Sequence, residues 1–396
     1  MEAAEPGHPT SDIPIGWYVH LPFCRTKCGY CDFYSLPTIA TLIDGLVAGL
    51  IAELTLCDPG RPVGTIFFGG GTPTELPAEA LGTLLSAIGQ RAGPVEEWTV
   101  EANPTSADDL KLETLRRSGV NRLSFGAQSF RESELKVLER LHDPRHIFES
   151  VRAARAVGFD NVNLDLMYAI PSQTLDDWRE TLRRAVDLEM EHLSCYALMY
   201  EPQTGLTRLR DQGRVVACDE MLEAEMFELT IEELTGVGFE HYEISNFARP
   251  GRTCRANILY WENREYLGIG PSAVSYLDGE RRKNIADVRC YVEWMGTEPG
   301  RVVVERERLR GIERAGETAM QMLRLTRGID VERFRDQTGV EPLEHFAEVI
   351  ERFNGLDLLE VDDRSIRLTR RGLLLANRVM AGFLVDENDS ARQSCA

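Results

Sequence analysis

The sequence predicts an α/β fold: a partial (βα)6 parallel barrel followed by a small, mainly helical, winged-helix-like C-terminal domain. From about residue 15 to residue 200, six short apolar runs alternate with segments of helical period, which is typical of βα units around a parallel sheet. A complete barrel of this kind has about eight units, so six indicate an incomplete one. Beyond about residue 300, charged helical segments precede a final run at 364–384, which predicts the separate C-terminal domain.

The six expected strands are rich in branched and aromatic residues. They are 15–22 (IGWYVHLP), 63–70 (VGTIFFGG), 97–104 (EWTVEANP), 121–128 (NRLSFGAQ), 161–171 (NVNLDLMYAIP) and 192–200 (HLSCYALMY). Amphipathic segments such as 42–56 and 175–190 lie between them and predict helices. In parallel barrels the functional side chains lie at the C-terminal ends of the strands and in the loops that follow. We therefore expect the motifs after these strands to meet at one mouth.

The rest of the chain completes the expected domain organisation. Residues 218–239 have the period of a long helix, and residues 240–248 (EHYEISNFA) predict a strand. The predicted organisation is a flexible N-terminus at 1–14, a barrel with its closing segment at 15–300, a C-terminal domain at 301–386 and a flexible tail at 387–396.

Composition excludes some classes of partner and location. A formal net charge of −20 opposes attraction to phosphate backbones and acidic lipids, so we expect no nucleic acid partner. The N-terminus lacks the features of a secretory signal, and no uninterrupted apolar run approaches the roughly 18 residues of a membrane span. Nine cysteines, an odd number, do not resemble the disulfide framework of a small secreted domain. We therefore expect free thiols, no membrane span and a cytoplasmic location.

Three cysteines, Cys24, Cys28 and Cys31, lie close together after the first strand. Three thiolates at this spacing can hold three irons of a [4Fe-4S] cluster and leave the fourth iron open for another ligand. Structural zinc needs four ligands, and no second C-x-x-C or H-x-x-H pair occurs. A thioredoxin-type dithiol uses two cysteines and leaves no place for Cys24. The run favours an iron–sulfur cluster, and the nearby His20 is interpreted as a hydrogen-bonded positioning residue rather than an iron ligand.

This spacing, with the aromatic Tyr30 before the third cysteine, resembles the radical S-adenosylmethionine (SAM) superfamily. The resemblance implies that the methionyl amine and carboxylate of SAM chelate the open iron, while the protein binds and orients the cofactor. The glycine-rich run at 69–74 (GGGTPT) would by itself indicate only a turn, since it has neither the spacing nor the lysine of a phosphate-binding loop. In the superfamily the equivalent run receives the methionyl ammonium.

Several polar residues lie where the expected strands end, and each one alone would be interpreted as a surface or salt-bridge residue. SAM offers an ammonium, a carboxylate and ribose hydroxyls, which need acids, a guanidinium and amides around them. The resemblance implies that Arg140 binds the carboxylate and that Ala197 lines the adenine or ribose pocket. It implies cofactor contacts at Tyr18, Tyr30, Gly70, Gly71, Thr72, Glu101, Gln128, Arg140, Asp165 and Ala197.

The resemblance covers almost the entire chain and narrows to the coproporphyrinogen-dehydrogenase-like group. Within it, CGYCDF at 28–33 and HYEISNFARPG at 241–251 resemble the HemW-type haem chaperones. The oxygen-independent coproporphyrinogen dehydrogenases carry a further cysteine where this chain has Phe33, and a longer arm before the first strand, where this chain has about 14 residues. Both departures favour the chaperone type.

One segment departs from the chaperone pattern His-Asn-x-x-Tyr-Trp, whose histidine is tied to haem binding. Here the segment reads ANILYW at 256–261, so Ala256 replaces the histidine and cannot ligate iron. Haem is then held by another ligand, held by packing only, or not held. Cys254 is the nearest soft ligand, although a lone cysteine is more often a small buried hydrophobe. The other haem candidates are Asn257, Tyr260 and Trp261, which are equally suited to the core of the closing segment.

The sequence therefore predicts a HemW-like haem chaperone that binds a [4Fe-4S] cluster and SAM and passes haem or a porphyrin to an acceptor protein. An electron donor such as a ferredoxin or flavodoxin is a further expected partner. Two alternatives stay open. One is a radical SAM enzyme acting on a tetrapyrrole, such as an oxygen-independent coproporphyrinogen III dehydrogenase, and the other is a divergent paralogue that has lost haem binding. No catalytic residue is assigned.

Overall fold

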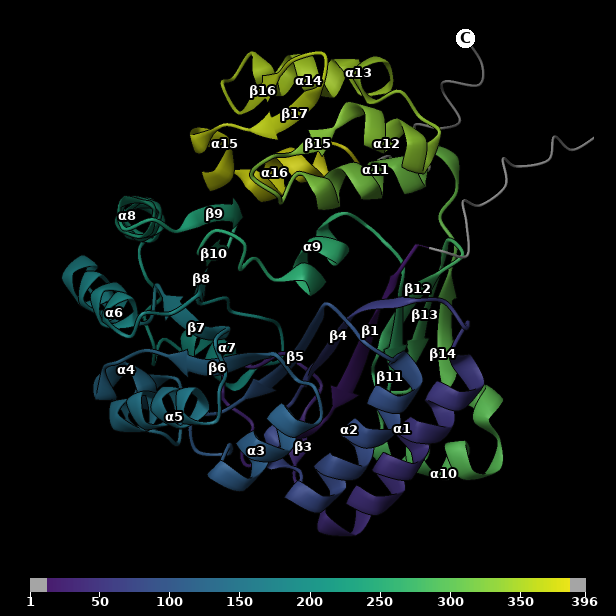
Figure 1. Ribbon diagram of the computed structural model, residues 1–396. Helices are drawn as coiled ribbons and strands as arrows, with labels where there is room; N and C mark the ends of the chain where they lie inside the picture. Colours follow the sequence, from purple (N-terminus) through teal and green to yellow (C-terminus); the bar gives the residue numbers. More distant parts are fainter. Residues whose placement is uncertain (1–12, 385–396) are drawn as a thin grey trace, which may run out of the picture.

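A computed structural model describes residues 13–384 of the chain (Figure 1). The expected flexible N-terminus at 1–14, apart from its last two residues, and the expected flexible tail at 387–396 lie outside the described residues. The centre of the structure consists of six parallel strands that lie side by side in chain order, as the sequence predicts. They are β1 (Ile15–Leu21), β4 (Val63–Gly70), β5 (Glu97–Ala102), β6 (Arg122–Gln128), β7 (Val162–Tyr168) and β8 (His192–Ala197).

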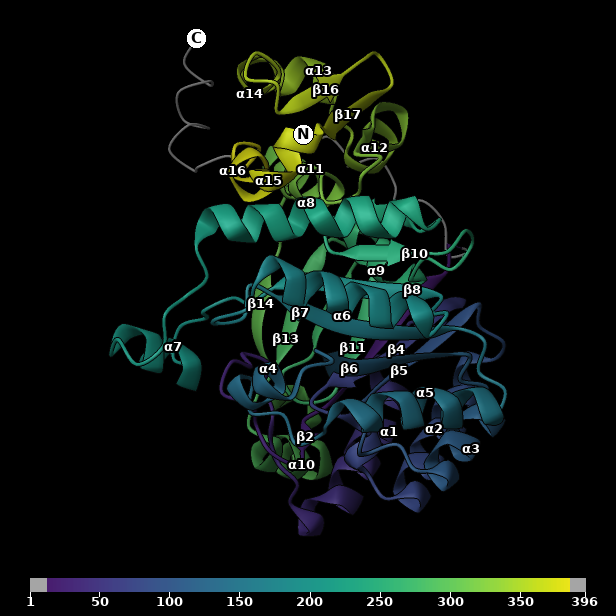
Figure 2. The ribbon, with the colours of Figure 1, turned by 90° about the vertical axis from the view of Figure 1, so that its left-hand side faces the viewer.

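Helices connect these strands, and the sheet curves without closing (Figure 2). Because β1 and β8 do not pair with each other, the prediction of an incomplete barrel is confirmed. The connecting helices are α1 (Ile43–Cys57), α2 (Ala78–Ala92), α3 (Asp109–Arg117), α4 (Glu132–Val137), α5 (Pro144–Ala156) and α6 (Leu175–Asp187). Two short strands, β2 (Phe23–Cys24) and β3 (Leu36–Pro37), bracket the cysteine run, and α7 (Gly205–Asp211) and α8 (Glu220–Gly236) follow β8.

Additional strands extend the sheet beyond both edges of the parallel core to a total of 12 among the described residues. On one side β1 pairs in parallel with β11 (Tyr266–Ile269), which is followed outward by β12 (Val274–Leu277), β13 (Glu280–Asn284) and β14 (Val303–Glu307). On the other side β8 pairs with β10 (Asn246–Ala248), and β10 pairs with β9 (Glu240–Glu243). The prediction of one strand at 240–248 is therefore wrong. The chain reverses here because the buried Glu243 carboxylate accepts hydrogen bonds from the Ser245 backbone N–H and the Asn246 side chain.

Strand alternation separates the hydrophobic core from the inner face of the sheet, as β1 illustrates. Trp17 and Val19 are almost fully buried in the large core between the sheet and the helices. Tyr18 and His20 lie on the opposite face, because successive side chains of a strand point to opposite sides. Tyr18 stacks on Phe67 of β4 with ring centroids 6.3 Å apart. The inner face of β1 therefore carries polar aromatic side chains, on the opposite side of the strand from the hydrophobic core.

Residues 40–57, which include α1, form a segment of 18 residues with a mean hydropathy of 1.7, long and apolar enough by these measures to cross a membrane. Asp44 and Glu53 interrupt this segment, so it is not the uninterrupted apolar run that the sequence analysis considered. In the structure, however, Leu46 and Leu50 are buried in the core. Glu53 of the same helix is also buried, and its carboxylate accepts hydrogen bonds from Gly270 N (2.7 Å) and Tyr291 Oη (2.6 Å). These contacts assign α1 to the protein core.

The C-terminal unit has a hydrophobic core of its own and lies beside α8, β9 and α9 (Arg255–Trp261) (Figure 1). Its helices are α11 (Gly311–Met322), α12 (Val331–Thr338), α13 (Pro342–His345), α14 (Ala347–Asn354), α15 (Arg370–Leu374) and α16 (Ala376–Ala381). Its small sheet consists of β15 (Ile329–Asp330), β17 (Ser365–Leu368) and β16 (Leu359–Val361). Helix α10 (Val288–Thr297) precedes β14, which belongs to the large sheet. We therefore propose that the C-terminal unit begins with α11 rather than at residue 301.

Candidate functional site

The cysteine loop is held to the end of β1 by hydrogen bonds that involve its backbone. Leu36 N donates to Pro22 O (2.9 Å), which closes the loop at its base. His20 Nε2 donates to Tyr34 O (2.9 Å), while His20 Nδ1 accepts from Tyr18 Oη (3.1 Å). Burial lowers the pKa of His20, which favours this neutral form. The interpretation of His20 as a positioning residue agrees with these contacts.

The glycine-rich loop after β4 lies directly against the cysteine loop. Gly71 N donates to Leu21 O (2.8 Å), and Thr72 N donates to Phe23 O (2.7 Å). A Cβ atom at Gly71 would lie 2.6 Å from Phe23 O, so no larger residue fits without moving one of the loops. Gly70 has a φ of +104°, and a Cβ there would lie 2.5 Å from the His20 ring. These glycines therefore bring the two loops into contact.

An open cavity of about 710 Å³ lies between these loops and the ends of β5, β6, β7 and β8. Most of the residues expected at the cofactor site line it together: Cys24, Cys28, Tyr30, Cys31, Gly70, Gly71, Thr72, Glu101, Gln128, Arg140 and Asp165. Tyr18 and Ala197 are not among the lining residues. The sequence did not single out Asn103, Ser124, Gly126 or Tyr196, which also line the cavity.

Two carboxyl groups face this cavity, and burial raises the pKa of both. Burial and the nearby Asp165 raise the pKa of Glu101 to about 8. Burial also raises the pKa of Asp165, although hydrogen bonds oppose this effect. Asn163 Nδ2 donates to Asp165 Oδ1 (2.7 Å), and Ser124 Oγ lies 3.4 Å from the same oxygen. A cation in the cavity would favour the ionised form of both groups.

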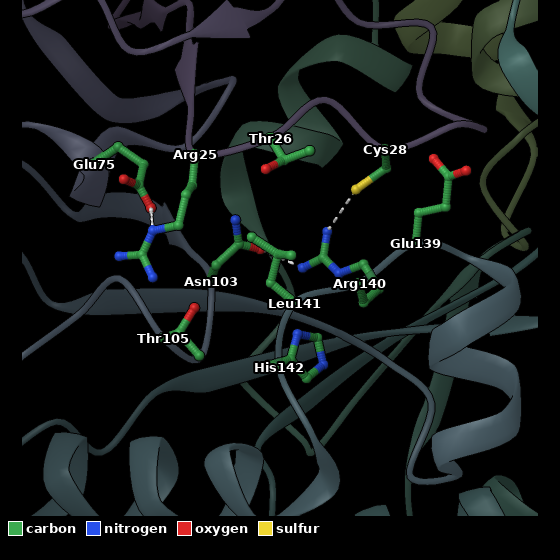
Figure 3. Close-up of a pocket in the computed structure, with 10 residues that line it drawn as sticks. All are labelled: Arg25, Thr26, Cys28, Glu75, Asn103, Thr105, Glu139, Arg140, Leu141 and His142. Carbon is green, nitrogen blue, oxygen red and sulfur yellow. Dashed lines mark hydrogen bonds and ion pairs between the residues drawn. The ribbon is translucent and has the colours of Figure 1, made fainter.

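Arg140 contributes a guanidinium group to the same cavity. Its Nη2 donates to Gly126 O (2.7 Å) and to Asn103 Oδ1, and its Nη1 donates to Cys28 Sγ (3.5 Å). Its Nε is buried and has no hydrogen-bond partner within the described part of the chain. A second, smaller cavity of about 340 Å³ is also lined by Arg140, Asn103 and Cys28 (Figure 3). The residues that line both cavities are Thr26, Cys28, Asn103 and Arg140.

Gln128 and Tyr196 form a hydrogen-bonded pair on the cavity wall. Tyr196 Oη donates to Gln128 Oε1 (2.8 Å), and Gln128 has a positive φ of 64°, which is uncommon for a residue other than glycine. The amide N–H₂ of Gln128 has no hydrogen-bond partner among residues 13–384, so it could donate to a ligand in the cavity.

The candidate haem residues lie elsewhere. Cys254 is fully buried, and its Sγ lies 3.5 Å from Oε1 of Glu97, the first residue of β5. The same Oε1 accepts a hydrogen bond from Ala256 N (3.1 Å). Glu101, which lines the cavity, lies near the other end of β5. Asn257, Tyr260 and Trp261 belong to α9 with Ala256 and do not line the cavity. The structure thus does not place these candidates at the cofactor cavity.

Comparison with known proteins places this chain in a family. The model of the Radical SAM superfamily matches residues 18–185, and the model of the HemN C-terminal domain matches residues 309–375. The curated heme chaperone HemW of Bacillus subtilis (strain 168) is 35% identical over 373 residues, which cover 93% of this chain and 98% of that protein. The chain belongs to the HemW family. The HemW proteins of Mycobacterium tuberculosis (34% identical, 95% of this chain and 96% of that protein) and Escherichia coli (38%, 67% and 72%) are further relatives.

The solved structure of coproporphyrinogen III oxidase (HemN) from Escherichia coli has the same fold as this HemW family member. The two align with a TM-score of 0.81 at 24% sequence identity, over 94% of this chain and 91% of that chain. At this identity the match supports the fold, including the C-terminal unit.

The side chains of this HemW family member fit the cluster and SAM that a radical SAM domain implies. Among residues 13–384, no three His, Cys, Asp or Glu side chains converge as a single metal ion would require. In a [4Fe-4S] cluster each thiolate binds a different iron, so the three sulfurs do not need to meet at one point. Three cysteines that line one cavity are compatible with this arrangement. The cavity also presents the acids, the guanidinium and the amide that the groups of SAM need.

Proposed function

We propose that this protein is a haem chaperone that uses a [4Fe-4S] cluster and SAM in receiving haem or passing it to an acceptor protein. The observation that carries this proposal is the 35% identity to the heme chaperone HemW of Bacillus subtilis over 98% of that relative. In the superfamily, the cluster supplies the electron that cleaves SAM reductively. The proposed cluster ligands are Cys24, Cys28 and Cys31, and Arg140 is the proposed partner of the SAM carboxylate.

The proposal includes a cytoplasmic location, a haem-accepting protein and an electron donor such as a ferredoxin or flavodoxin. The alternative of a coproporphyrinogen III dehydrogenase is less well supported, because several relatives that align along most of this chain are named HemW. The likeness to HemN at 24% identity supports the shared fold and not a shared reaction.

Anaerobic titration of the reconstituted protein with haem tests this proposal, combined with an assay for 5′-deoxyadenosine. A chaperone is expected to bind haem in a saturable way and to release it to an acceptor. Absence of haem binding, together with turnover of SAM in the presence of coproporphyrinogen, would instead establish the dehydrogenase. Absence of both would indicate a paralogue that has lost haem.

Replacement of Cys254 by alanine is expected to leave the haem absorption spectrum unchanged. The thiol is fully buried beside Glu97, and burial raises its pKa to about 12, so it stays protonated and out of reach of a haem iron. Cys290→Ala is the control, because Cys290 lies in α10, away from both α9 and the cavity. Loss of an iron–thiolate band only in Cys254→Ala would contradict this prediction and restore Cys254 as the ligand.

The affinity for SAM is expected to rise between pH 6.5 and pH 8 more in the wild type than in Glu101→Gln. The pKa of Glu101 is raised to about 8, so below that pH its carboxyl must lose a proton before it attracts the positive groups of SAM. The effect can reach about tenfold per pH unit. Calorimetry at several pH values measures it, and the amine of SAM titrates equally with both proteins. Parallel pH profiles for the two proteins would show that Glu101 does not contact the cofactor as an anion.

A further inference from the structure

We propose that Asn103 is a positioning residue that fixes the Arg140 guanidinium and links it to the cluster ligands. This inference rests on the proposed cluster and SAM site, but it does not depend on haem. Asn103 follows β5 directly, one residue beyond the end of the strand, where the chain leaves the sheet. Asn103 is partly buried and lines both cavities, of which Figure 3 shows the smaller.

The Asn103 carboxamide uses both of its ends. Its Oδ1 accepts a hydrogen bond from Arg140 Nη2, and its Nδ2 donates to Thr72 Oγ1 (2.8 Å). Thr72 Oγ1 in turn lies 3.6 Å from Cys24 Sγ, within hydrogen-bond distance for sulfur. A continuous chain of polar contacts therefore runs from Arg140 through Asn103 and Thr72 to Cys24.

Arg140 also contacts a second cysteine directly. Its Nη1 donates to Cys28 Sγ (3.5 Å), so the guanidinium is connected to two of the three cysteines, directly to Cys28 and through Asn103 to Cys24. Its Nη2 also donates to Gly126 O (2.7 Å). Without Asn103, the Nη2 group would keep one hydrogen bond, and the direction of the guanidinium would be less well defined.

Two properties should depend on this arrangement. A guanidinium that is already oriented loses less freedom when it binds a carboxylate, so Asn103 should increase the affinity for SAM. Hydrogen bonds to the cysteine sulfurs and nearby charge set the reduction potential of a cluster. Asn103 should therefore also raise that potential, because it keeps a cation next to Cys28.

The test uses the full chain, reconstituted anaerobically, with Asn103→Ala and the isosteric Asn103→Asp. Asn103→Ala is expected to keep its iron and sulfide, to bind SAM about tenfold more weakly, as the loss of a hydrogen bond to a charged group implies, and to have a more negative midpoint potential. Asn103→Asp keeps an acceptor for Arg140 but neutralises its charge, so it is expected to weaken SAM binding and lower the potential further. Calorimetry with SAM and potentiometric titration followed by electron paramagnetic resonance measure these quantities.

Asn121→Ala is the matched control, because Asn121 accepts a hydrogen bond from Trp98 N (2.8 Å) at the start of β5 and does not line either cavity. It is expected to change neither SAM affinity nor potential. Wild-type affinity and potential in both Asn103 variants would overturn the inference. Loss of the cluster from both variants would also overturn it, because Asn103 would then position the cysteine loop and not the Arg140 guanidinium. If only Asn103→Ala loses its cluster, the SAM affinity and midpoint potential of Asn103→Asp decide whether the inference stands. A wild type that holds the cluster and SAM but not haem would refute the chaperone proposal alone.

Discussion

Replacement of Cys24, Cys28 or Cys31 by alanine is expected to abolish the bound iron and sulfide of the reconstituted protein. The three thiolates are the full set of protein ligands that we propose for the cluster, so removal of one would leave a second iron without a protein ligand. The loop should remain in place in these variants, because the hydrogen bonds that hold it use the backbone atoms Pro22 O and Tyr34 O. Iron and sulfide analysis after anaerobic reconstitution measures the effect.

Cys57→Ala and Cys290→Ala are the controls for this prediction. Cys57 is exposed at the end of α1, and Cys290 is partly buried in α10. Neither lines the cavity. Both variants are expected to keep the iron and sulfide content of the wild type. A variant with alanine at all three positions of the cysteine run that still held a full complement of iron and sulfide would refute the assignment of the cluster.

The parallel core was predictable because each of its strands is a short apolar run with a clear boundary. The 63–70 segment, for example, coincides with β4. The outer strands were not predictable in this way. β13 (Glu280–Asn284) has the sequence ERRKN, whose charged side chains form ion pairs such as Arg281 with Glu307 of β14 (3.1 Å) and Lys283 with Glu305 (3.2 Å). A strand held by cross-strand ion pairs carries no apolar period.

The hairpin at 240–248 was missed for a different reason. Its turn is stabilised by one side chain, Glu243, rather than by glycine, proline or an Asn-Gly pair, which are the usual signals of a turn. Glu243 also lies 3.5 Å from Arg324 of the C-terminal unit. The reversal of the chain therefore depends partly on a contact with a residue 81 positions away, which no local pattern reveals.

The candidate site was predictable to the extent that single residues follow the strands. Glu101 occurs near the end of β5, where a barrel collects its functional groups, whereas Asp165 lies in the middle of β7 and still lines the cavity. Asn103 and Tyr196 follow the same rule, but their role appears only in contacts with partners 37 and 68 residues away along the chain. For the haem candidates, sequence proximity was misleading. Cys254 lies two residues from Ala256 and was therefore considered as a haem ligand, but the structure buries its thiol against Glu97.

Arg140→Ala and Asp165→Ala are expected to weaken SAM binding by about ten- to hundredfold while the cluster content stays at the wild-type level. Each change removes a charge-assisted contact worth about 1.5–3 kcal/mol. Arg140 supplies the guanidinium of the cavity, and Asp165 supplies a carboxylate that Asn163 already orients through a hydrogen bond of 2.7 Å. Calorimetric titration of the reconstituted proteins with SAM gives the affinities, and iron analysis of the same samples confirms that the clusters are intact.

Arg145→Ala and Asp176→Ala are matched controls of the same residue types. Their side chains are 85% and 91% exposed, and neither lines the cavity, so both variants are expected to bind SAM as the wild type does. The two site variants should also differ in one respect. Arg140 donates to Cys28 Sγ, whereas no hydrogen bond of Asp165 reaches a cysteine within the described residues, so Arg140→Ala should lower the reduction potential of the cluster and Asp165→Ala should change it less. Wild-type affinity in both site variants would show that the cofactor does not occupy this cavity, even if the cysteines hold the cluster.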